Sequence, residues 1–249
     1  MIDLENEQRN IGWFRARLGN ITGSRVGDLM KAGRAKADTF GETAKTYMMQ
    51  LAAERMMNPA IVEDDDLFGQ YLEQVEVSSK AMRFGQEMED KARDLFSKMS
   101  GFEIAEASSC KHDRVAHFAA SPDGIICVDL RPLAALEIKC PNQNTFVKYL
   151  GITDGESLKR IKPEYYWQTQ AEMSCTDVNF AYFVAYCPWQ KNPIHIALIE
   201  RNPDDEALML ERIELANGVI DEICKTDEQR DDLPRIFREV YDLATAPAL

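Results

Sequence analysis

The chain has 249 residues, of which 45% are hydrophobic, and its net charge is −13 at pH 7. This length and apolar fraction are enough for one sizeable core, and no apolar run approaches the roughly 18 residues that a membrane span needs. No signal peptide is expected from the sequence, and the six cysteines are scattered without a Cys-x-x-Cys pair, which favours reduced thiols over disulfides or a structural zinc site. We therefore expect a cytoplasmic protein that has no contact with a membrane.

The chain before residue 100 is predicted to be mainly helical, with a loop near residues 31–41 and an acidic connector at residues 58–66. A short helix is expected at residues 25–31, directly after Ser24. Serine is a common helix N-cap, and the amino terminus of a helix also attracts anions, so Ser24 has both a structural and a binding interpretation.

Residues 80–99 form a further predicted helix with one apolar stripe that faces the core. The stripe consists of Met88, Ala92, Leu95, Phe96 and Met99. Glu89 lies next to this stripe, where its carboxylate can point toward the edge of a sheet. Its neighbours Glu87 and Asp90 are better interpreted as solvated side chains.

Two strand-like runs at residues 125–128 and 134–139 read as a β-hairpin that follows a Pro-Asp-Gly turn. Side chains alternate between the faces of a strand, so Glu137 and Lys139 project from the same side, and Asp123 in the turn can join them. Alternatively, Asp123 only makes the turn, and Glu137 and Lys139 form the solvated face of a strand.

The residue types in this hairpin suit a divalent cation. Mg²⁺ prefers oxygen ligands and usually takes one or two carboxylates from the protein, which Asp123 and Glu137 can provide. The backbone carbonyl of Ile138 lies between the side chains of Glu137 and Lys139 and is a further candidate ligand. The ammonium of Lys139 can orient an attacking water and stabilise charge on a phosphate.

The remaining elements continue a mixed sheet with helices on its faces. A sheet over residues 102–140 is followed by crossover helices and two more strands, and then by two amphipathic acidic helices. The predicted ranges are 142–150 and 163–175 for the crossover helices, 179–187 and 193–200 for the strands, and 204–225 and 229–244 for the last helices. No Gly-x-x-x-x-Gly-Lys-Ser/Thr loop occurs, so no ATP-driven activity is expected.

Five motifs occur in one order over about residues 13–201. They are Arg-Leu-Gly-Asn-Ile-Thr-Gly-Ser at 17–24, Phe-Gly-Gln-Glu-Met-Glu at 84–89, Ser-Pro-Asp-Gly at 121–124 with Leu-Glu-Ile-Lys-Cys-Pro at 136–141, Tyr-Tyr-Trp-Gln-Thr-Gln at 165–170, and a last strand pair at 182–201. In this order they resemble the phage λ exonuclease and YqaJ-type viral recombinase nucleases of the restriction-endonuclease-like superfamily.

The resemblance implies an α/β fold with a restriction-endonuclease-like core, in which helices flank a mixed central β-sheet. We expect one nuclease domain over residues 1–249, with a mainly helical part at 1–100, the catalytic sheet and crossover helices at 102–201, and the C-terminal helices at 204–249.

The resemblance also assigns residues. It makes Glu89, Asp123 and Glu137 the metal carboxylates, and it places Lys139 beside the attacking water. Gln168 contacts that water or the scissile phosphate, although a glutamine in a packed helix can also serve only to satisfy backbone groups.

At the amino-terminal motif, the resemblance implies that Arg17 and Ser24 hold a phosphate at or near a 5′ end. Arginine is suited to this because its guanidinium can bind phosphate through two hydrogen bonds. On a surface helix, Arg17 would otherwise be an ordinary solvated charge.

The expected activity is Mg²⁺-dependent 5′-to-3′ degradation of one strand of linear double-stranded DNA, with Mn²⁺ as an alternative ion, leaving 3′ overhangs for recombination. The family also implies a trimer with DNA in its bore and a single-strand annealing protein as partner. Two alternatives stay open: a structure- or sequence-specific endonuclease of the same fold, and a non-catalytic DNA-binding subunit.

The net charge is unusual for a protein that binds DNA, since neutralising phosphates requires a basic face. Basic residues gather in the first 45 residues, whereas acidic residues gather at 63–66 and in the last fifty. The basic residues are Arg15, Arg17, Arg25, Lys31, Arg34, Lys36 and Lys45. An acidic exterior around a basic channel would reconcile the charge with DNA binding.

Overall fold

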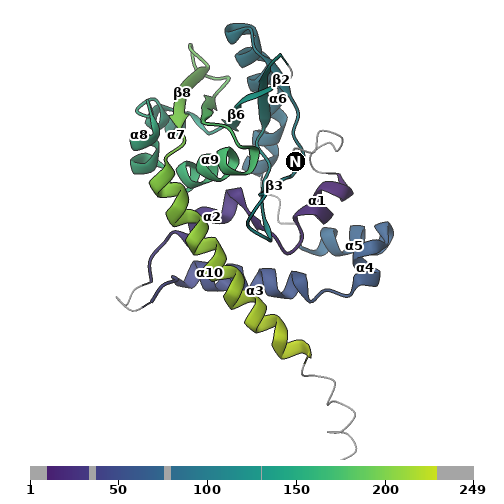
Figure 1. Ribbon diagram of the computed structural model, residues 1–249. Coiled ribbons are helices and arrows are strands. Elements are labelled where there is room, and N and C mark those ends of the chain that lie inside the picture. The colour runs from purple at the N-terminus through teal and green to yellow at the C-terminus, as the bar shows by residue number, and fades with distance from the viewer. Residues whose placement is uncertain (1–9, 34–37, 76–79, 130, 229–249) are drawn as a thin grey trace, which may run out of the picture.

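The structure is a computed structural model that describes residues 10–33, 38–75, 80–129 and 131–228 (Figure 1). The prediction of a second C-terminal helix at 229–244 lies outside these residues, as does most of the basic segment around 34–36. Among the described residues, no helix is long and apolar enough to cross a membrane. All six cysteines are described, and none of them forms a disulfide.

The amino-terminal part is helical, as predicted. Its helices are α1 (Ile11–Arg17), α2 (Gly23–Leu29), α3 (Glu42–Arg55), α4 (Pro59–Glu63), α5 (Asp65–Val75) and α6 (Lys80–Ser100). The prediction of a connector at 58–66 is wrong, because this stretch contains α4 and the start of α5. Its acids favour a helix start: Asp64 accepts a hydrogen bond from the backbone N–H of Leu67 at 2.9 Å, and negative charge in a first turn is stabilised by the helix dipole.

The central sheet has five strands in the order β2-β5-β6-β7-β8. Their bounds are Glu103–Ala105 for β2, Gly124–Val128 for β5, Arg131–Lys139 for β6, Phe180–Tyr186 for β7 and Ile194–Glu200 for β8. Among the described strands of this sheet, β6 and β7 pair in parallel and the other neighbours are antiparallel, so the sheet is mixed, as predicted. The predicted hairpin is the antiparallel pair β5 and β6, with Gly124 opposite Leu136.

Three helices make the crossover from β6 to β7: α7 (Gln143–Tyr149), α8 (Gly155–Ile161) and α9 (Pro163–Thr176). The sequence predicted α7 and α9 and missed α8. The missed helix is only two turns long, and it is fixed by a capping box in which Asp154 and Ser157 satisfy each other's backbone N–H groups.

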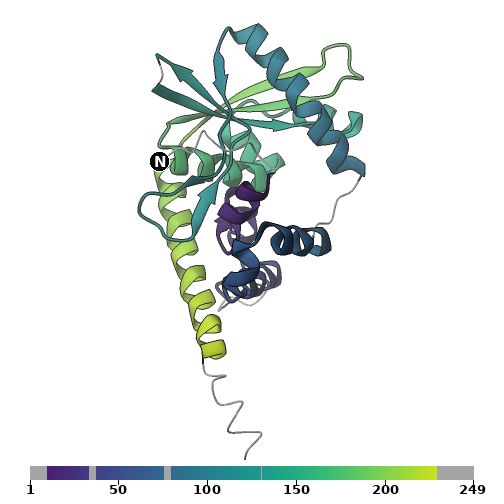
Figure 2. The same cartoon turned by 90° about the vertical axis from the view of Figure 1, so that its right-hand side faces the viewer.

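The two faces of the sheet carry different helices. Ala135 and Phe183 belong to the core under α9, whereas Ile138 and Val184 pack with Phe96 of α6 on the other face. In Figure 2, α6 crosses one side of the sheet, and α9 with the amino-terminal helices lies on the other side. Because side chains alternate along β6, Glu137 is directed to the α9 face and Ile138 to the α6 face.

A second, three-stranded sheet joins the amino-terminal motif to the hairpin. It consists of β1 (Ile21–Thr22), β4 (Phe118–Ala120) and β3 (Cys110–Lys111), with β1 parallel to β4. The pairing of Ile21 with Phe118 brings the end of α1 close to the turn that carries Asp123. The prediction of a single sheet over residues 102–140 is wrong here, because β3 and β4 belong to this separate sheet.

The long helix α10 (Pro203–Glu228) corresponds to the helix predicted at 204–225 and crosses α3 (Figure 1). Arg55 at the end of α3 donates to Asn217 at 2.6 Å and to Asp221 at 3.0 Å. These bonds fix α10 to the amino-terminal helices.

Candidate active site

The acids of the hairpin lie together at the start of β5 and the end of β6. Asp123 accepts a hydrogen bond from the backbone N–H of Ile138 through Oδ2 at 2.7 Å, which fixes its carboxylate beside the end of β6. Glu137 is fully buried, with 0% of its surface exposed. The alternative in which Glu137 is part of a solvated strand face is therefore wrong.

Lys139 lies on the same side as Glu137, as the alternation of the strand predicted. Its ammonium forms an ion pair with the Glu137 carboxylate, and its Nζ atom lies 4.9 Å from the centre of the Tyr165 ring. Burial acts to lower the pKa of Lys139, but the nearby carboxylates of Glu137 and Asp123 outweigh it and raise that pKa. Lys139 is thus a cation over the whole physiological range of pH.

The pair of acids is short of positive charge. Burial and then the charge of Glu137 raise the pKa of Asp123 to about 7. Both carboxylate oxygens of Glu137 are buried, and apart from the ion pair with Lys139 neither is satisfied by a donor within the described part of the chain, so two acids share one ammonium. Oxygen donors with unsatisfied negative charge are what a hard divalent cation requires, so these residues fit Mg²⁺.

Glu89 approaches the same end of β6 from α6. Its charge, after burial, helps to raise the pKa of the Cys140 thiol to about 12, and Asp123 contributes to the same shift. Among the described residues, however, no group of three or more His, Cys, Asp or Glu side chains is arranged to hold a metal ion. The three predicted metal carboxylates therefore do not form a ready-made cage, and Asp123 with Glu137 is the pair that lies together.

Arg93 on α6 is a contributor that the sequence did not reveal. Its Nε donates to the backbone carbonyl of Asp123 at 3.1 Å, and its Nη1 donates to Asp90 at 2.9 Å. Asp90 is solvated, as predicted, with 82% of its side chain exposed. Arg93 thus holds the turn of Asp123 against α6.

The helix α9 supplies two polar side chains to the same region. Gln168 is buried, and its Nε2 donates to Oε1 of Glu172 at 3.0 Å. Burial and the charge of Glu137 raise the pKa of Glu172 well above its usual range. Glu172, four residues after Gln168 on the same helix, was not predicted as a site residue.

Another glutamine on α9, Gln170, satisfies backbone groups, which was the alternative role considered for Gln168. Gln170 donates to the carbonyl of Glu200 at 3.0 Å and accepts from the N–H of Asn202 at 2.9 Å, so it satisfies backbone groups. Gln168 instead bonds a carboxylate that faces Glu137.

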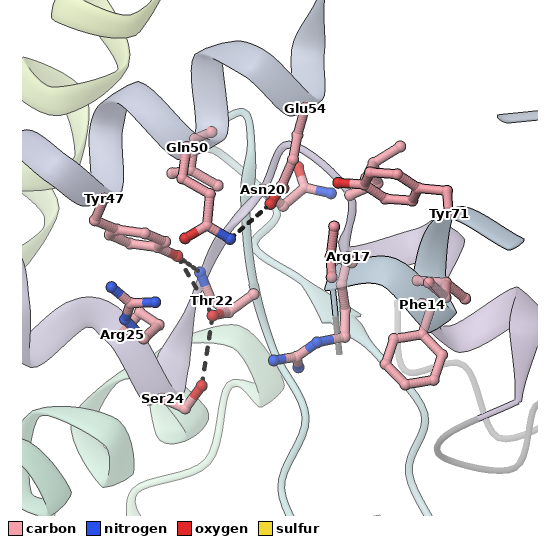
Figure 3. Close-up of a pocket in the computed structure, with 14 residues that line it drawn as sticks. Phe14, Arg17, Asn20, Thr22, Ser24, Arg25, Tyr47, Gln50, Glu54 and Tyr71 are labelled. Carbon is pink, nitrogen blue, oxygen red and sulfur yellow. Dashed lines mark hydrogen bonds between the residues drawn. The ribbon is translucent and has the colours of Figure 1, made fainter. Parts of the chain in front are cut away.

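Arg17 and Ser24 line a pocket of about 310 Å³ between α1, α2, α3 and α5 (Figure 3). The Nη1 of Arg17 donates to Oγ of Ser121 at 3.0 Å, and its guanidinium lies 4.2 Å from the centre of the Trp13 ring. The interpretation of Arg17 as an ordinary solvated charge is therefore wrong. Ser121, which the sequence analysis did not single out as a binding residue, joins this pocket to the Asp123 turn.

Ser24 has a different local setting from the one predicted. The helix α2 begins at Gly23, with Thr22 as its N-cap, so the predicted helix at 25–31 starts too late and Ser24 does not cap it. Ser24 is exposed, and its Oγ lies 3.5 Å from Oγ1 of Thr22. Its hydroxyl is directed at the pocket beside Arg25 (Figure 3).

The model of the YqaJ-like viral recombinase domain family matches residues 12–179. The chain belongs to this family. No curated protein matches the chain. The predicted family membership is confirmed.

Solved structures agree with this assignment. The chain is similar to the alkaline exonuclease LHK-Exo from Laribacter hongkongensis, with 28% identity and a TM-score of 0.69 over 90% of this chain and 100% of that chain. The complex of LHK-Exo with dAMP gives 29% identity and a TM-score of 0.68 over the same shares. A phage-related exonuclease from Haemophilus somnus 129PT shares the fold, with 16% identity and a TM-score of 0.58 over 83% of this chain and 96% of that chain. The predictions of the fold class and of a nuclease are confirmed.

Proposed function

We propose that the chain is a Mg²⁺-dependent 5′-to-3′ exonuclease that degrades one strand of linear double-stranded DNA and leaves 3′ overhangs. The observation that carries this proposal is the closeness of a pocket suited to phosphate and a pair of acids suited to a cation. Ser121 accepts a hydrogen bond from Arg17, which lines the pocket, and Asp123, two residues further on, belongs to the pair of acids.

Asp123, Glu137 and the backbone carbonyl of Ile138 would hold the ion, with Mn²⁺ as an alternative to Mg²⁺. When bound, the ion supplies the Lewis acid for hydrolysis of the phosphodiester. Glu89, whose charge reaches the Cys140 thiol next to Lys139, would be a further ligand of the same ion.

The side chains around this centre have separate tasks. The Lys139 ammonium stabilises the negative charge that grows on the phosphate as the bond breaks. Gln168 uses its amide N–H to bind Glu172, which leaves its amide oxygen to orient the water that attacks.

The phosphate pocket supports the proposed polarity. Arg17 and Ser24 line the pocket and would offer a guanidinium and a hydroxyl to a terminal 5′ phosphate, and Ser121 holds the Arg17 guanidinium in place. A strand held by that phosphate presents its first phosphodiester to the acids, so hydrolysis releases a mononucleotide. The binding of dAMP by LHK-Exo supports the same class of product here.

The proposal extends to the setting of the enzyme. We place it in the cytoplasm of a bacterial host, as a homotrimer around DNA that acts with a single-strand annealing protein. The basic pocket residues Arg17 and Arg25 on an otherwise acidic chain support a buried DNA path over an exposed one.

The test is digestion of linear duplex DNA labelled separately at each 5′ and 3′ end, in Mg²⁺ and in EDTA, beside a closed circle. Loss of the 5′ label in Mg²⁺ alone, with an intact circle and an inactive Lys139→Ala variant, is the expected result. A nicked circle would identify an endonuclease instead. Binding of DNA with no cleavage in either condition would identify a non-catalytic subunit.

A further inference from the structure

Glu172 is a buried acid that the chemistry above does not require as a ligand. It lies on α9, opposite β6, with 1% of its surface exposed. One carboxylate oxygen receives the hydrogen bond of Gln168 Nε2 at 3.0 Å. The other is buried against the Glu137 carboxylate and has no other partner among the described residues, and Glu137 itself is paired with the Lys139 ammonium.

Packing alone does not explain an acid at this place. Its neighbours on α9, Ala171 and Met173, are apolar and fully buried, so this part of the helix is packed as core. Burying a carboxyl group without full hydrogen bonding opposes folding, and apolar replacement of buried charged groups is often neutral or stabilising. A residue that opposes folding at the edge of an active site points to a role in function.

We propose that Glu172 is a positioning residue of the metal centre, which holds Gln168 through one oxygen and orients the Glu137 carboxylate with the other. It acts through these two side chains and does not itself touch substrate. This inference rests on the proposed function, because it assigns Glu137 to the ion and Gln168 to the water.

In this proposal, the side chain at position 172 must accept a hydrogen bond from the Gln168 amide and must hydrogen-bond Glu137. Glutamine provides both, since its carbonyl oxygen accepts and its amide group donates. Leucine has a similar size and provides neither. A carboxylate needed as a direct ligand of the ion would not be replaced by either.

The experiment compares Glu172→Gln and Glu172→Leu with Thr169→Val as the matched control. Thr169 is also fully buried on α9, and its hydroxyl bonds only the carbonyl of Tyr166 among the described contacts, at 2.9 Å. Binding of Ca²⁺ and Mn²⁺ is measured by calorimetry without turnover, and kcat and KM for DNA are measured as a function of Mg²⁺.

Loss of a residue that orients metal ligands typically weakens metal binding or activity about 10–100-fold. We expect Glu172→Leu to weaken ion binding about tenfold or more and to lower kcat, with KM for DNA unchanged. Glu172→Gln and Thr169→Val should stay within about threefold of the wild type, since neither breaks these two contacts.

Gln168→Leu tests the same contact from its other side and covers the case in which Glu172→Leu does not fold. It should lower kcat, and the double variant should be no worse than the worse single variant, because both break one bond. Additive losses would overturn the inference. So would unchanged ion binding in a folded Glu172→Leu, or a loss in Glu172→Gln as large as in Glu172→Leu. A wild type that binds no ion and cuts no DNA would instead overturn the proposed function.

Discussion

Replacement of Arg17 by glutamine tests whether the pocket that Arg17 lines binds the 5′ phosphate of DNA. The guanidinium of Arg17 has one neutral partner in the structure, Ser121, and it stacks on Trp13 at 4.2 Å. No ion pair of Arg17 is found among the described residues, so its charge is available to an anion. Glutamine keeps a side chain that can bond Ser121 and removes the charge.

The size of the effect follows from the bond that is lost. A hydrogen bond to a charged partner contributes about 1.5–3 kcal/mol, and about 1.4 kcal/mol corresponds to a factor of ten. Arg17→Gln should therefore reduce kcat/KM on DNA with a 5′ phosphate by about 10- to 150-fold. On DNA with a 5′ hydroxyl, which has no terminal phosphate to lose, the change should be small.

The assay is digestion of two duplexes of identical sequence, one phosphorylated and one with a free 5′ hydroxyl, by the wild type and by Arg17→Gln. The measured quantity is the ratio of kcat/KM between the two ends. Equal losses on both duplexes would show that Arg17 supports the fold near Ser121, and an unchanged preference for the phosphate would place its recognition elsewhere. Either result would refute the assignment of the pocket.

Four other outcomes are expected. Glu137→Gln should abolish detectable cleavage and reduce Mn²⁺ binding in calorimetry, while unchanged binding would remove Glu137 from the metal centre. Since the pKa of Asp123 is raised to about 7, the folded protein binds more protons than the unfolded chain between about pH 4 and 7, so this group makes the metal-free protein less stable as pH rises through that window. Thermal unfolding should show this trend, and the trend should be smaller in Asp123→Asn. Mg²⁺ affinity should rise over the same window, because the carboxylate ionises. Ser121→Ala should weaken the preference for a 5′ phosphate less than Arg17→Gln does, because it removes a neutral partner, and an equal or larger effect in the same ratio assay would contradict this order. Phe96→Ala, at a site with 1% exposure, should lower the free energy of unfolding by about 3–5 kcal/mol in urea titration, and a loss under about 1 kcal/mol would show that α6 does not form part of the core.

The hairpin and its acids could be predicted from the sequence because their signals are local. A Pro-Asp-Gly turn and strand alternation determine which side Glu137 and Lys139 occupy, and the structure agrees. The helix α6 was equally readable, since its apolar stripe has a clear period and buries Ala92 and Phe96. The prediction was wrong for Met99 in the last turn, which is 60% exposed.

The second sheet could not be predicted in this way. Strands of two or three residues, such as β1, β3 and β4, are too short to show a period, and the pairing of β1 with β4 joins Ile21 to Phe118, about a hundred positions further along the chain. Ser121 was therefore seen as part of a turn and not as a partner of Arg17. The placement of Arg17 and Ser24 in one site came from the resemblance to a family, and their role in binding phosphate stays a prediction.

Glu172 escaped notice for another reason. Every residue of α9 from Tyr166 to Thr176 is buried, so the helix has no solvent face against which an unusual polar residue would stand out. In such a helix, only the partners of each side chain reveal whether it supports the fold, as Gln170 does, or belongs to a site, as Gln168 and Glu172 do.

In the proposed enzyme, the segment from Ser121 to Asp123 would set a fixed distance between the phosphate pocket and the acids. Two residues of extended chain span at most about 7 Å, and the ring of the buried Pro122 between them restricts the backbone further. In the proposed function, the phosphate pocket and the acids would thus be separated by a short, fixed length of backbone. The size of each released piece would then follow from this separation, with no need for the protein to recognise the bases of the DNA.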